Sequence, residues 1–465
     1  MSQAILREHE AAAGVRLRLV RQLDRCGSFP CILSEPLKAD PFAWLAAQPP
    51  RGRFLWRDRG EMSIQAAFDA IRTIRASAGE SLESLMDRCR QCLAELPAEQ
   101  RLFGGFAFRF DGPDLVAPWD HFRRGEFWLP RFTLGDGTLR MLVLDGRDAE
   151  AARLALESLR VSDSPPSGDW PSCQRRHDQP DLEGWTRNVR QALQLFASEV
   201  LEKVVLARQV TLTFASEVDP WALLSSMSGV TPNCYQFAFE PEADSVFMGA
   251  TPERLYKRQG GTLSSEVVAG TRRRGGSADE DRRLGEELLA SEKDQLEHHI
   301  VRKSIRQRLH SFVESLEVDA RAALLKLASK QHLFSRVSGR LRPNTRDEDL
   351  LGRLHPTPAV GGYPTENALA EISRLEPFER GWYAAPVGWI SRDASEFVVA
   401  IRSALLRGRD LHLFSGAGIV PGSTPEAEWD EIEAKIADFL QILLPGGRCS
   451  GWPQSDDAST GGKRR

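Results

Sequence analysis

The stretch LHLFSGAGIVPGSTPEAEWDEIEAKIADFLQIL, residues 411–443, joins an apolar strand, a glycine turn and a long helix. The turn is Gly416-Ala417-Gly418, whose backbone N–H groups are available to an anion. The helix begins after Thr424, because threonine is a good N-cap and Pro425 suits the first helical position. The stretch therefore predicts a strand and a helix with a possible anion site between them.

Inside this helix, Glu428, Glu431 and Lys435 follow one another at spacings of three and four residues and share one face. The apolar residues fill the neighbouring sector, which is the stripe expected to face the core: Trp429, Ile432, Ile436, Phe439, Leu440 and Leu443. Two carboxylates beside a glycine turn are compatible with a site for a metal ion and an anionic ligand. A solvated acidic face after an ordinary turn is the alternative.

Composition limits the classes of function. The chain has 465 residues, 41% hydrophobic, which is enough for a large core. Its 61 basic and 65 acidic residues leave a net charge of -4, so no electrostatic argument favours nucleic acid or an anionic membrane. No apolar run reaches the length of a membrane span, and the N-terminal MSQAILREHE has no hydrophobic leader segment. We expect an unprocessed, soluble, cytoplasmic protein.

The cysteines indicate the same compartment. There are seven, an odd number with irregular spacing, which favours reduced thiols. Cys89 and Cys92 form a single CxxC in a predicted helix, without the second pair that a zinc site requires.

Hydrophobic periodicity predicts the elements. Residues 15–20, VRLRLV, alternate like a half-buried strand, whereas 64–78 and 81–96 resemble helices. Residues 277–316 predict one long charged helix. The Ser-, Pro- and Asp-rich segment 161–181 is typical of a linker. The Gly/Ser-rich tail 446–465 is expected to be disordered.

A second acidic pair lies in the long predicted helix. Asp294 and Glu297 are three residues apart in SEKDQLEHHIV. Two helices that each offer carboxylate oxygens would suit Mg²⁺, which binds a few carboxylates and leaves positions for a ligand. A charged helix with Lys293 and Arg302 nearby is otherwise usually solvated.

Three further residues have types and settings suited to catalysis or recognition. Lys203 begins an apolar strand, where burial can lower a lysine pKa enough for a general base, although such a lysine can also reach water. Glu253, in a tight turn, suits a general acid, with an exposed ion pair to Arg254 as the alternative. Arg402 lies on a strand between small residues, which leaves room for bidentate carboxylate binding.

Together these segments resemble the chorismate-binding enzyme family, and within it the isochorismate synthases, over about residues 182–443. The motifs are EKVVLAR (202–208), FMGATPERL (247–255), VVAGTRRRG (267–275), SEKDQLEHHIV (291–301), LHPTPAVGGYP (354–364), GWYAAPVGWI (381–390), FVVAIRSALL (397–406) and FSGAGIVPGSTPEAEWDEIEAKI (414–436). Weaker matches, GGFAFRF (104–110), APWDHF (117–122) and FWLPRF (127–132), extend the likeness over the N-terminal third.

The resemblance implies roles for individual residues. Lys203 would be the base that activates water for attack at C2 of chorismate, and Glu253 the acid that protonates the departing C4 hydroxyl. Mg²⁺ would be bound by Glu297 and Glu431, with Asp294 and Glu428 holding its waters. The remaining expected substrate-binding residues are Gly270, Thr271 and Lys435 at the ring carboxylate, Tyr383, Arg402, Gly416 and Gly418 at the enolpyruvyl carboxylate, and His355 and Thr357 beside the ring.

The resemblance also separates branches of the family. Relatives that form anthranilate carry Gln in place of Lys203, and relatives that form aminodeoxychorismate often carry Lys in place of Ala269. This chain has Lys203 and Ala269, which favours water as the nucleophile. Salicylate synthase, which also eliminates pyruvate, is the alternative enzyme, and a non-catalytic chorismate- or metal-binding module is the alternative of another class. Departures are small: Glu266-Val267 stands where a proline often precedes the Ala-Gly pair, and Ser335 lies in a strand that often carries threonine.

The implied fold is α+β, with an anthranilate synthase component I-like architecture: a single large sandwich of two mostly antiparallel sheets packed face to face, with helices outside. Residues 1–180 would form the N-terminal part of the sandwich, 181–445 the chorismate-binding catalytic region and 446–465 the tail. We expect a monomer with chorismate as its small-molecule substrate, and no nucleic acid, membrane or glutamine amidotransferase partner.

Overall fold

The computed structural model describes residues 3–60, 63–162, 164, 166, 168–445 and 449. Its strands form two walls, and every pairing is antiparallel. The first wall runs in the order β3 (Ile64–Arg75), β2 (Arg53–Arg57), β9 (Tyr235–Glu242), β10 (Ser245–Thr251), β19 (Ser403–Arg407), β20 (Asp410–Ile419), β8 (Lys203–Phe214) and β7 (Cys173–Gln179), with β16 (Gly362–Tyr363) also on β8.

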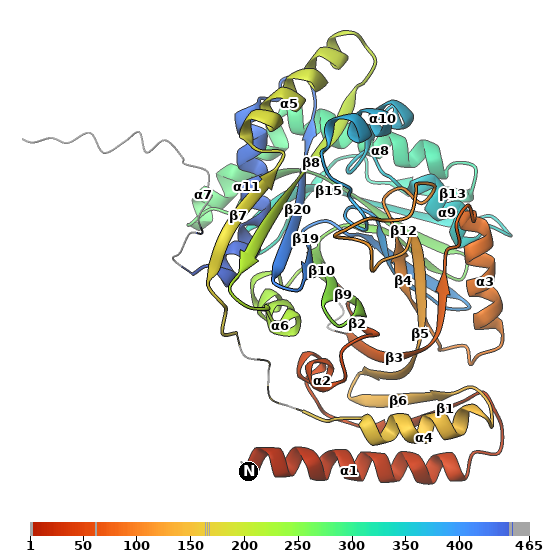
Figure 1. The fold of residues 1–465 in the computed structure, drawn as a ribbon. Coiled ribbons are helices and arrows are strands. Elements are labelled where there is room, and N and C mark those ends of the chain that lie inside the picture. The colour runs from red at the N-terminus through yellow and green to blue at the C-terminus, as the bar shows by residue number, and fades with distance from the viewer. Residues whose placement is uncertain are drawn as a thin grey trace, which may run out of the picture.

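The second wall lies opposite the first (Figure 1). Its order is β4 (Leu102–Phe106), β17 (Pro386–Ile390), β18 (Ala394–Val399), β11 (Arg254–Gln259), β12 (Thr262–Arg273) and β15 (Lys330–Leu341), with β13 (Val313–Val318) and β14 (Ala323–Lys326) both on β15. The long strand β5 (Gly125–Gly135) pairs with β3, β4 and β6 (Thr138–Val143), and β6 pairs with β1 (Cys31–Pro36). Hydrogen bonding through β5 therefore joins the two walls into one folded sheet.

Aromatic side chains fill the space between the walls. Phe54 of β2 packs on Phe103 of β4 with ring centroids 4.6 Å apart, and Trp128 of β5 stacks on Phe239 of β9 at 3.8 Å. These rings belong to a continuous buried cluster. The α+β class is confirmed, and apolar burial between the walls supplies its main core.

Helices cover the outside (Figure 1). Helices α1 and α4 lie against β1 and β6, α2 and α6 against the first wall, and α8 against β12. The bounds are α1 (Gln3–Asp24), α2 (Pro41–Ala47), α3 (Leu82–Ala94), α4 (Asp148–Ser158), α5 (Leu182–Ala197), α6 (Pro220–Val230), α7 (Ala278–Ala290), α8 (Glu292–Leu309), α9 (Asp347–Leu354), α10 (Thr365–Leu375) and α11 (Pro425–Leu443).

Several predicted elements are confirmed, and three are wrong. The predicted turn Gly416-Ala417-Gly418 is part of the strand β20, where it pairs with β8. Helix α11 starts at the expected place, and the hydroxyl of its N-cap Thr424 accepts from the N–H of Ala427. Residues 15–20 lie in α1 instead of a strand, because Val15 and Leu19 belong to a buried stripe of helical spacing. The predicted helix 64–78 is the strand β3, which lies between β2 and β5.

Two expectations for longer segments, and one for the cysteines, also need correction. The long charged helix is divided at Ser291, which ends α7 and caps α8 by accepting from the N–H of Asp294. Part of the predicted linker is the strand β7, paired with β8. The tail lies outside the described residues except for Cys449, which forms a disulfide with Cys173. The expectation that all thiols are reduced is therefore wrong for this pair, although five cysteines are free.

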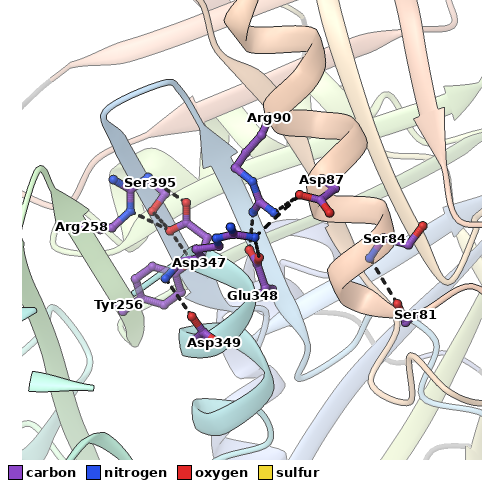
Figure 2. Close-up of polar contacts among 11 residues, drawn as sticks. Ser81, Ser84, Asp87, Arg90, Tyr256, Arg258, Asp347, Glu348, Asp349 and Ser395 are labelled. Atoms are coloured by element: carbon purple, nitrogen blue, oxygen red, sulfur yellow. Dashed lines mark hydrogen bonds and ion pairs between the residues drawn. The ribbon is translucent and has the colours of Figure 1, made fainter. Parts of the chain in front are cut away.

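Polar contacts fix α9 against the second wall and against α3 (Figure 2). The carboxylate of Asp347 accepts from Tyr256 and Arg258 of β11 and from Ser395 of β18, at 2.5–3.0 Å. Arg90 of α3 pairs with Glu348. These bonds set the position of the loop that follows α9. No helix among the described residues has the length and apolar character needed to cross a membrane.

Candidate active site

Lys203 is the first residue of β8 and is fully buried. Its Nζ donates to Oε1 of Glu297 on α8, at 2.9 Å. On the neighbouring strand β20, Gly418 lies against this pair: a Cβ at position 418 would stand 2.5 Å from the Glu297 oxygen and 3.1 Å from Cε of Lys203. The glycine therefore provides the space in which the buried lysine and the glutamate meet.

Glu253 lies where the chain crosses from β10 in the first wall to β11 in the second. Its backbone is anchored on both sides: its N–H donates to the hydroxyl of Thr251, and its carbonyl accepts from the N–H of Val399. No described residue donates a hydrogen bond to its buried carboxyl group. Burial raises the pKa of Glu253 to about 8, against the opposing charge of Lys203. The carboxyl is therefore protonated at neutral pH, as a general acid must be.

Arg402 lies on a second crossover, from β18 to β19, with a backbone φ of 50°. Its Nη2 donates to Nε2 of His332 at 2.5 Å. With Nε2 accepting, the proton of the neutral ring is on Nδ1, which lies 3.2 Å from the carbonyl oxygen of Gly270 and 3.1 Å from the hydroxyl of Thr271. Burial, followed by the charge of Arg402, lowers the pKa of His332 and keeps the ring neutral. His332 thus joins three predicted substrate-binding residues.

Gly416 is surrounded by two further predicted residues. A Cβ at position 416 would lie 3.0 Å from the hydroxyl oxygen of Tyr383, whose ring stacks on Phe414. The carbonyl of Gly416 accepts from Nζ of Lys435 at 2.9 Å. Gly416, Tyr383 and Lys435 therefore form one cluster next to the Lys203 pair.

Each of the four predicted metal-binding carboxylates is bound to a basic side chain. The pairs are Asp294 with Arg272 (2.8 Å), Glu297 with Lys203 (2.9 Å), Glu428 with Lys293 (2.5 Å) and Glu431 with Lys435 (2.7 Å). Within the described part of the chain, no group of three or more His, Cys, Asp or Glu side chains is arranged to hold a metal ion.

The donor set nevertheless fits a hard divalent cation. Burial and then the charge of Glu431 raise the pKa of Glu428, which shows that the two carboxylates repel one another. Burial lowers the pKa of Lys293, but the charges of Glu428, Glu431 and Glu297 outweigh it and raise the pKa. An ammonium group therefore lies among three glutamates, a position that favours positive charge. All-oxygen ligands of this kind suit Mg²⁺.

His355 and Thr357 follow α9 in the loop that leads to β16. Nε2 of His355 donates to the carbonyl of Phe108 at 3.0 Å, and the Thr357 hydroxyl accepts from the N–H of Ala359. The loop itself lies beside Lys203, because Tyr363 pairs with that residue. In the described residues, no hydrogen bond connects either side chain to the cluster above, so their predicted contact with the ring stays a prediction.

The sequence reasoning missed His332 as a site residue and treated Lys293 only as a neighbouring charge. A histidine inside the apolar strand QHLFSRV was the available signal for His332, because a buried histidine needs partners for both ring nitrogens. For Lys293, the signal was its position between the acidic residues of the SEKDQLE segment.

The site combines a buried lysine, a buried neutral carboxyl and an arginine with the acidic faces of two helices. These groups lie on a folded antiparallel sheet, and the fold and the site together define the class of this protein. The chain belongs to the chorismate-binding enzyme family, whose model, described as "Chorismate binding enzyme", matches residues 20–444.

Within the family, the chain is similar to isochorismate synthases. The chain is 38% identical over 351 residues to isochorismate synthase MenF of Bacillus subtilis, covering 74% of each chain. It is 34% identical over 417 residues to MenF of Escherichia coli, covering 88% of this chain and 92% of the relative. A solved structure of the menaquinone-specific isochorismate synthase MenF from Escherichia coli superposes with a TM-score of 0.81 at 32% identity, over 92% of this chain and all of that one.

Proposed function

We propose that this protein is an isochorismate synthase, which converts chorismate to isochorismate. The observation that carries the proposal is the pairing of a buried lysine, Lys203, with a buried carboxyl, Glu253, whose raised pKa keeps it protonated at neutral pH. After burial, the charge of Lys203 has the largest influence on the pKa of Glu253. The identity to isochorismate synthases over most of the chain supports the same reaction.

The reaction needs one base and one acid. In the neutral form, the amine of Lys203 takes a proton from water, whose oxygen attacks C2 of the ring while the double bonds shift. The C4 hydroxyl leaves with the proton of Glu253, so one water enters and one leaves. Lys203 ends protonated and Glu253 ionised, and a proton must return from lysine to glutamate before the next turnover.

Substrate recognition needs compensation for two carboxylates. Arg402, oriented by His332, provides a guanidinium for one of them. Gly270 and Thr271, next to Asp294, provide backbone and hydroxyl groups for the other. We propose that Glu297 and Glu431, with Asp294 and Glu428, hold Mg²⁺, which would neutralise the ring carboxylate. The 19-residue helix α11 and the 18-residue helix α8 carry these acids and pack on the sheet, which fixes their positions.

The direct test is to incubate the purified protein with chorismate and Mg²⁺ and to identify the product by chromatography. Isochorismate without pyruvate is expected. Stoichiometric pyruvate, measured with lactate dehydrogenase, would instead identify salicylate synthase, and Mg²⁺-dependent binding without turnover would identify a binding module. Lys203→Ala should abolish water addition while substrate binding persists, and equal activity of this variant would refute the assigned base.

The proposal extends to the setting of the enzyme. We propose a monomer that acts in the cytoplasm without an amidotransferase subunit, and a product that enters either menaquinone or siderophore formation. One relative is described as menaquinone-specific, which supports the first route, and genomic neighbours of the coding sequence would test it. Five free cysteines support a reducing compartment, whereas the Cys173–Cys449 bond opposes it.

A further inference from the structure

Arg59 is a largely buried cation supplied by the N-terminal third. It follows β2, the strand that pairs with β3 and β9, and its side chain is 14% exposed. The guanidinium lies over the rings of Tyr235, at 5.2 Å, and Phe334, at 6.0 Å. Since an arginine held between two rings has few accessible rotamers, its hydrogen bonds have defined directions.

Both terminal nitrogens of Arg59 bind groups of the catalytic region. Nη1 donates to the carbonyl of Pro252, the residue directly before Glu253. Nη2 donates to Oε1 of Glu266 on β12, at 2.5 Å. Thr251 and Val399 already anchor the backbone of Glu253 itself. The bond from Arg59 adds a third anchor on the crossover, at a proline that has no N–H of its own to donate.

The second contact of Arg59 is an ion pair with the buried carboxylate of Glu266. Glu266 is 6% exposed and is shared by Arg59 and Arg254, whose Nη1 lies 3.3 Å from the same oxygen. Arg254 also donates to Glu396, at 2.9 Å. The negative charge of Glu266 acts on Glu253. Arg59 therefore contacts both the turn that carries Glu253 and a carboxylate that repels its ionised form.

We propose that Arg59 is a positioning residue that directs the carboxyl of Glu253, by holding the Pro252 carbonyl and by compensating the charge of Glu266. This inference rests on the proposed function, because it assumes that Glu253 is the acid. It also gives the N-terminal third a part in the reaction, since β2 and β9 carry Arg59 to the crossover.

The charged and titratable groups that act on Glu253 define the expected pH behaviour. They are Lys203 on β8, Glu266 on β12, Lys435 on α11, Arg402 on the second crossover and Tyr383. Activity falls with rising pH as Glu253 ionises. Replacing Arg59 by a neutral residue exposes Glu253 to more of the Glu266 charge, which raises the pKa of Glu253. The alkaline limb of the pH profile of kcat should therefore move to higher pH. Glu266→Gln removes that charge, so the limb should move to lower pH.

The experiment compares kcat and KM between pH 6 and 10 for the wild type, Arg59→Met, Arg59→Lys and Glu266→Gln. Arg57→Met is the matched control, because Arg57 lies on the same segment and, among the described residues, its side chain donates only to the amide oxygen of Gln236, at 3.3 Å. Thermal unfolding of every variant reports whether it is folded.

Arg59→Met should lower kcat about 10- to 100-fold, because a misplaced catalytic group costs up to about 100-fold, with KM within about twofold. The two alkaline limbs should move in opposite directions by about half a pH unit, since both changes act on Glu253 without touching it. Arg59→Lys should recover part of kcat, and Arg57→Met should match the wild type. Any of three results would overturn the inference. They are an unchanged kcat in folded Arg59→Met, alkaline limbs of the kcat profiles that move in the same direction, and a loss of kcat in Arg57→Met equal to that in Arg59→Met. If Arg59→Met does not fold, Arg59→Lys and Glu266→Gln decide it by the same criteria.

A separate readout distinguishes this inference from the proposed function. If the wild type does not convert chorismate, the proposed function is wrong whatever the variants do. The titration of Glu253 can then be followed in the ligand-free protein by carbon-13 NMR of labelled glutamate, with Glu253→Gln to assign the signal. Opposite shifts in Arg59→Met and Glu266→Gln would support the coupling, and an unchanged Glu253 titration in both would refute it.

Discussion

Oε1 of Glu297 on α8 accepts a hydrogen bond from Nζ of Lys203 on β8, at 2.9 Å. The proposed base and a proposed metal ligand thus share one bond. Glu297 therefore holds the amine of the proposed base in place, and a shift of the glutamate should displace that amine.

Gly418→Ala tests this pair sterically. The new Cβ would lie 2.5 Å from the glutamate oxygen, which must move because real Cβ atoms do not approach so closely. We expect kcat to fall about 100-fold, the cost of a misplacement of about 1 Å, with a small change in thermal stability because the clash involves the end of a side chain. Gly261→Ala is the control, since no heavy atom of the described residues, apart from the glycine and its two chain neighbours, lies within 4 Å of its added Cβ. Equal kcat values for Gly418→Ala and the wild type would contradict the predicted role of the contact.

Lys293→Met tests the proposed cation site. The ammonium of Lys293 bonds Glu428 at 2.5 Å and lies within the field of Glu431 and Glu297. Removing it leaves Glu428 without its ion-pair partner and takes a positive charge away from Glu431 and Glu297. Mg²⁺ affinity should therefore rise about tenfold, which corresponds to about 1.4 kcal/mol. Titration calorimetry on the ligand-free protein measures this affinity. Glu431→Ala should weaken binding instead, and weaker binding by Lys293→Met would show that the lysine supports the site.

Local sequence determined much of the fold and of the site. The N-cap Thr424 and the i, i+3 acidic pairs depend on neighbouring residues, and the structure has them as predicted. The stretch Gly416-Ala417-Gly418 is not the predicted turn, because its pairing with β8 extends the strand β20 through it. Residues 15–20 were misassigned because a six-residue alternation fits a strand as well as a helix, and the buried stripe through Leu23 becomes visible only in a longer window.

The contacts that could not be predicted join distant segments. His332 meets Arg402, 70 residues away, and Arg59 meets Glu266, 207 residues away. No spacing rule brings such residues together, because their meeting depends on how β5 folds the two walls of the sheet. For the same reason, the basic partners of the four carboxylates were not foreseen as a set.

His332→Leu tests recognition of the substrate by Arg402. The leucine removes the acceptor at 2.5 Å from the guanidinium and the donor to Gly270. Because a hydrogen bond to a charged group is worth about 1.5–3 kcal/mol, KM should rise about 10- to 100-fold. His332→Gln should recover part of this loss, since its amide oxygen can accept from Arg402. A rise in KM that glutamine leaves unchanged, or no rise at all, would show that Arg402 is positioned by other contacts.

Glu253→Gln tests the acid through both activity and stability. Loss of the transferable proton should lower kcat about 10²- to 10⁴-fold. Burial raises the pKa of Glu253 from 4.5 to about 8, so the folded protein keeps a proton that the unfolded chain releases. This contribution to stability is fully present below pH 4.5 and is lost as pH rises through about 8.

The difference in melting temperature between wild type and Glu253→Gln should therefore change in one direction between pH 5 and 9, by an amount equivalent to a few kcal/mol. The wild type should lose stability relative to the variant, because glutamine does not ionise. Melting curves in a series of buffers at constant ionic strength measure the difference. A difference that is constant across this range would show that Glu253 has an ordinary pKa in the folded protein, and the assignment of Glu253 as the neutral acid would then fail.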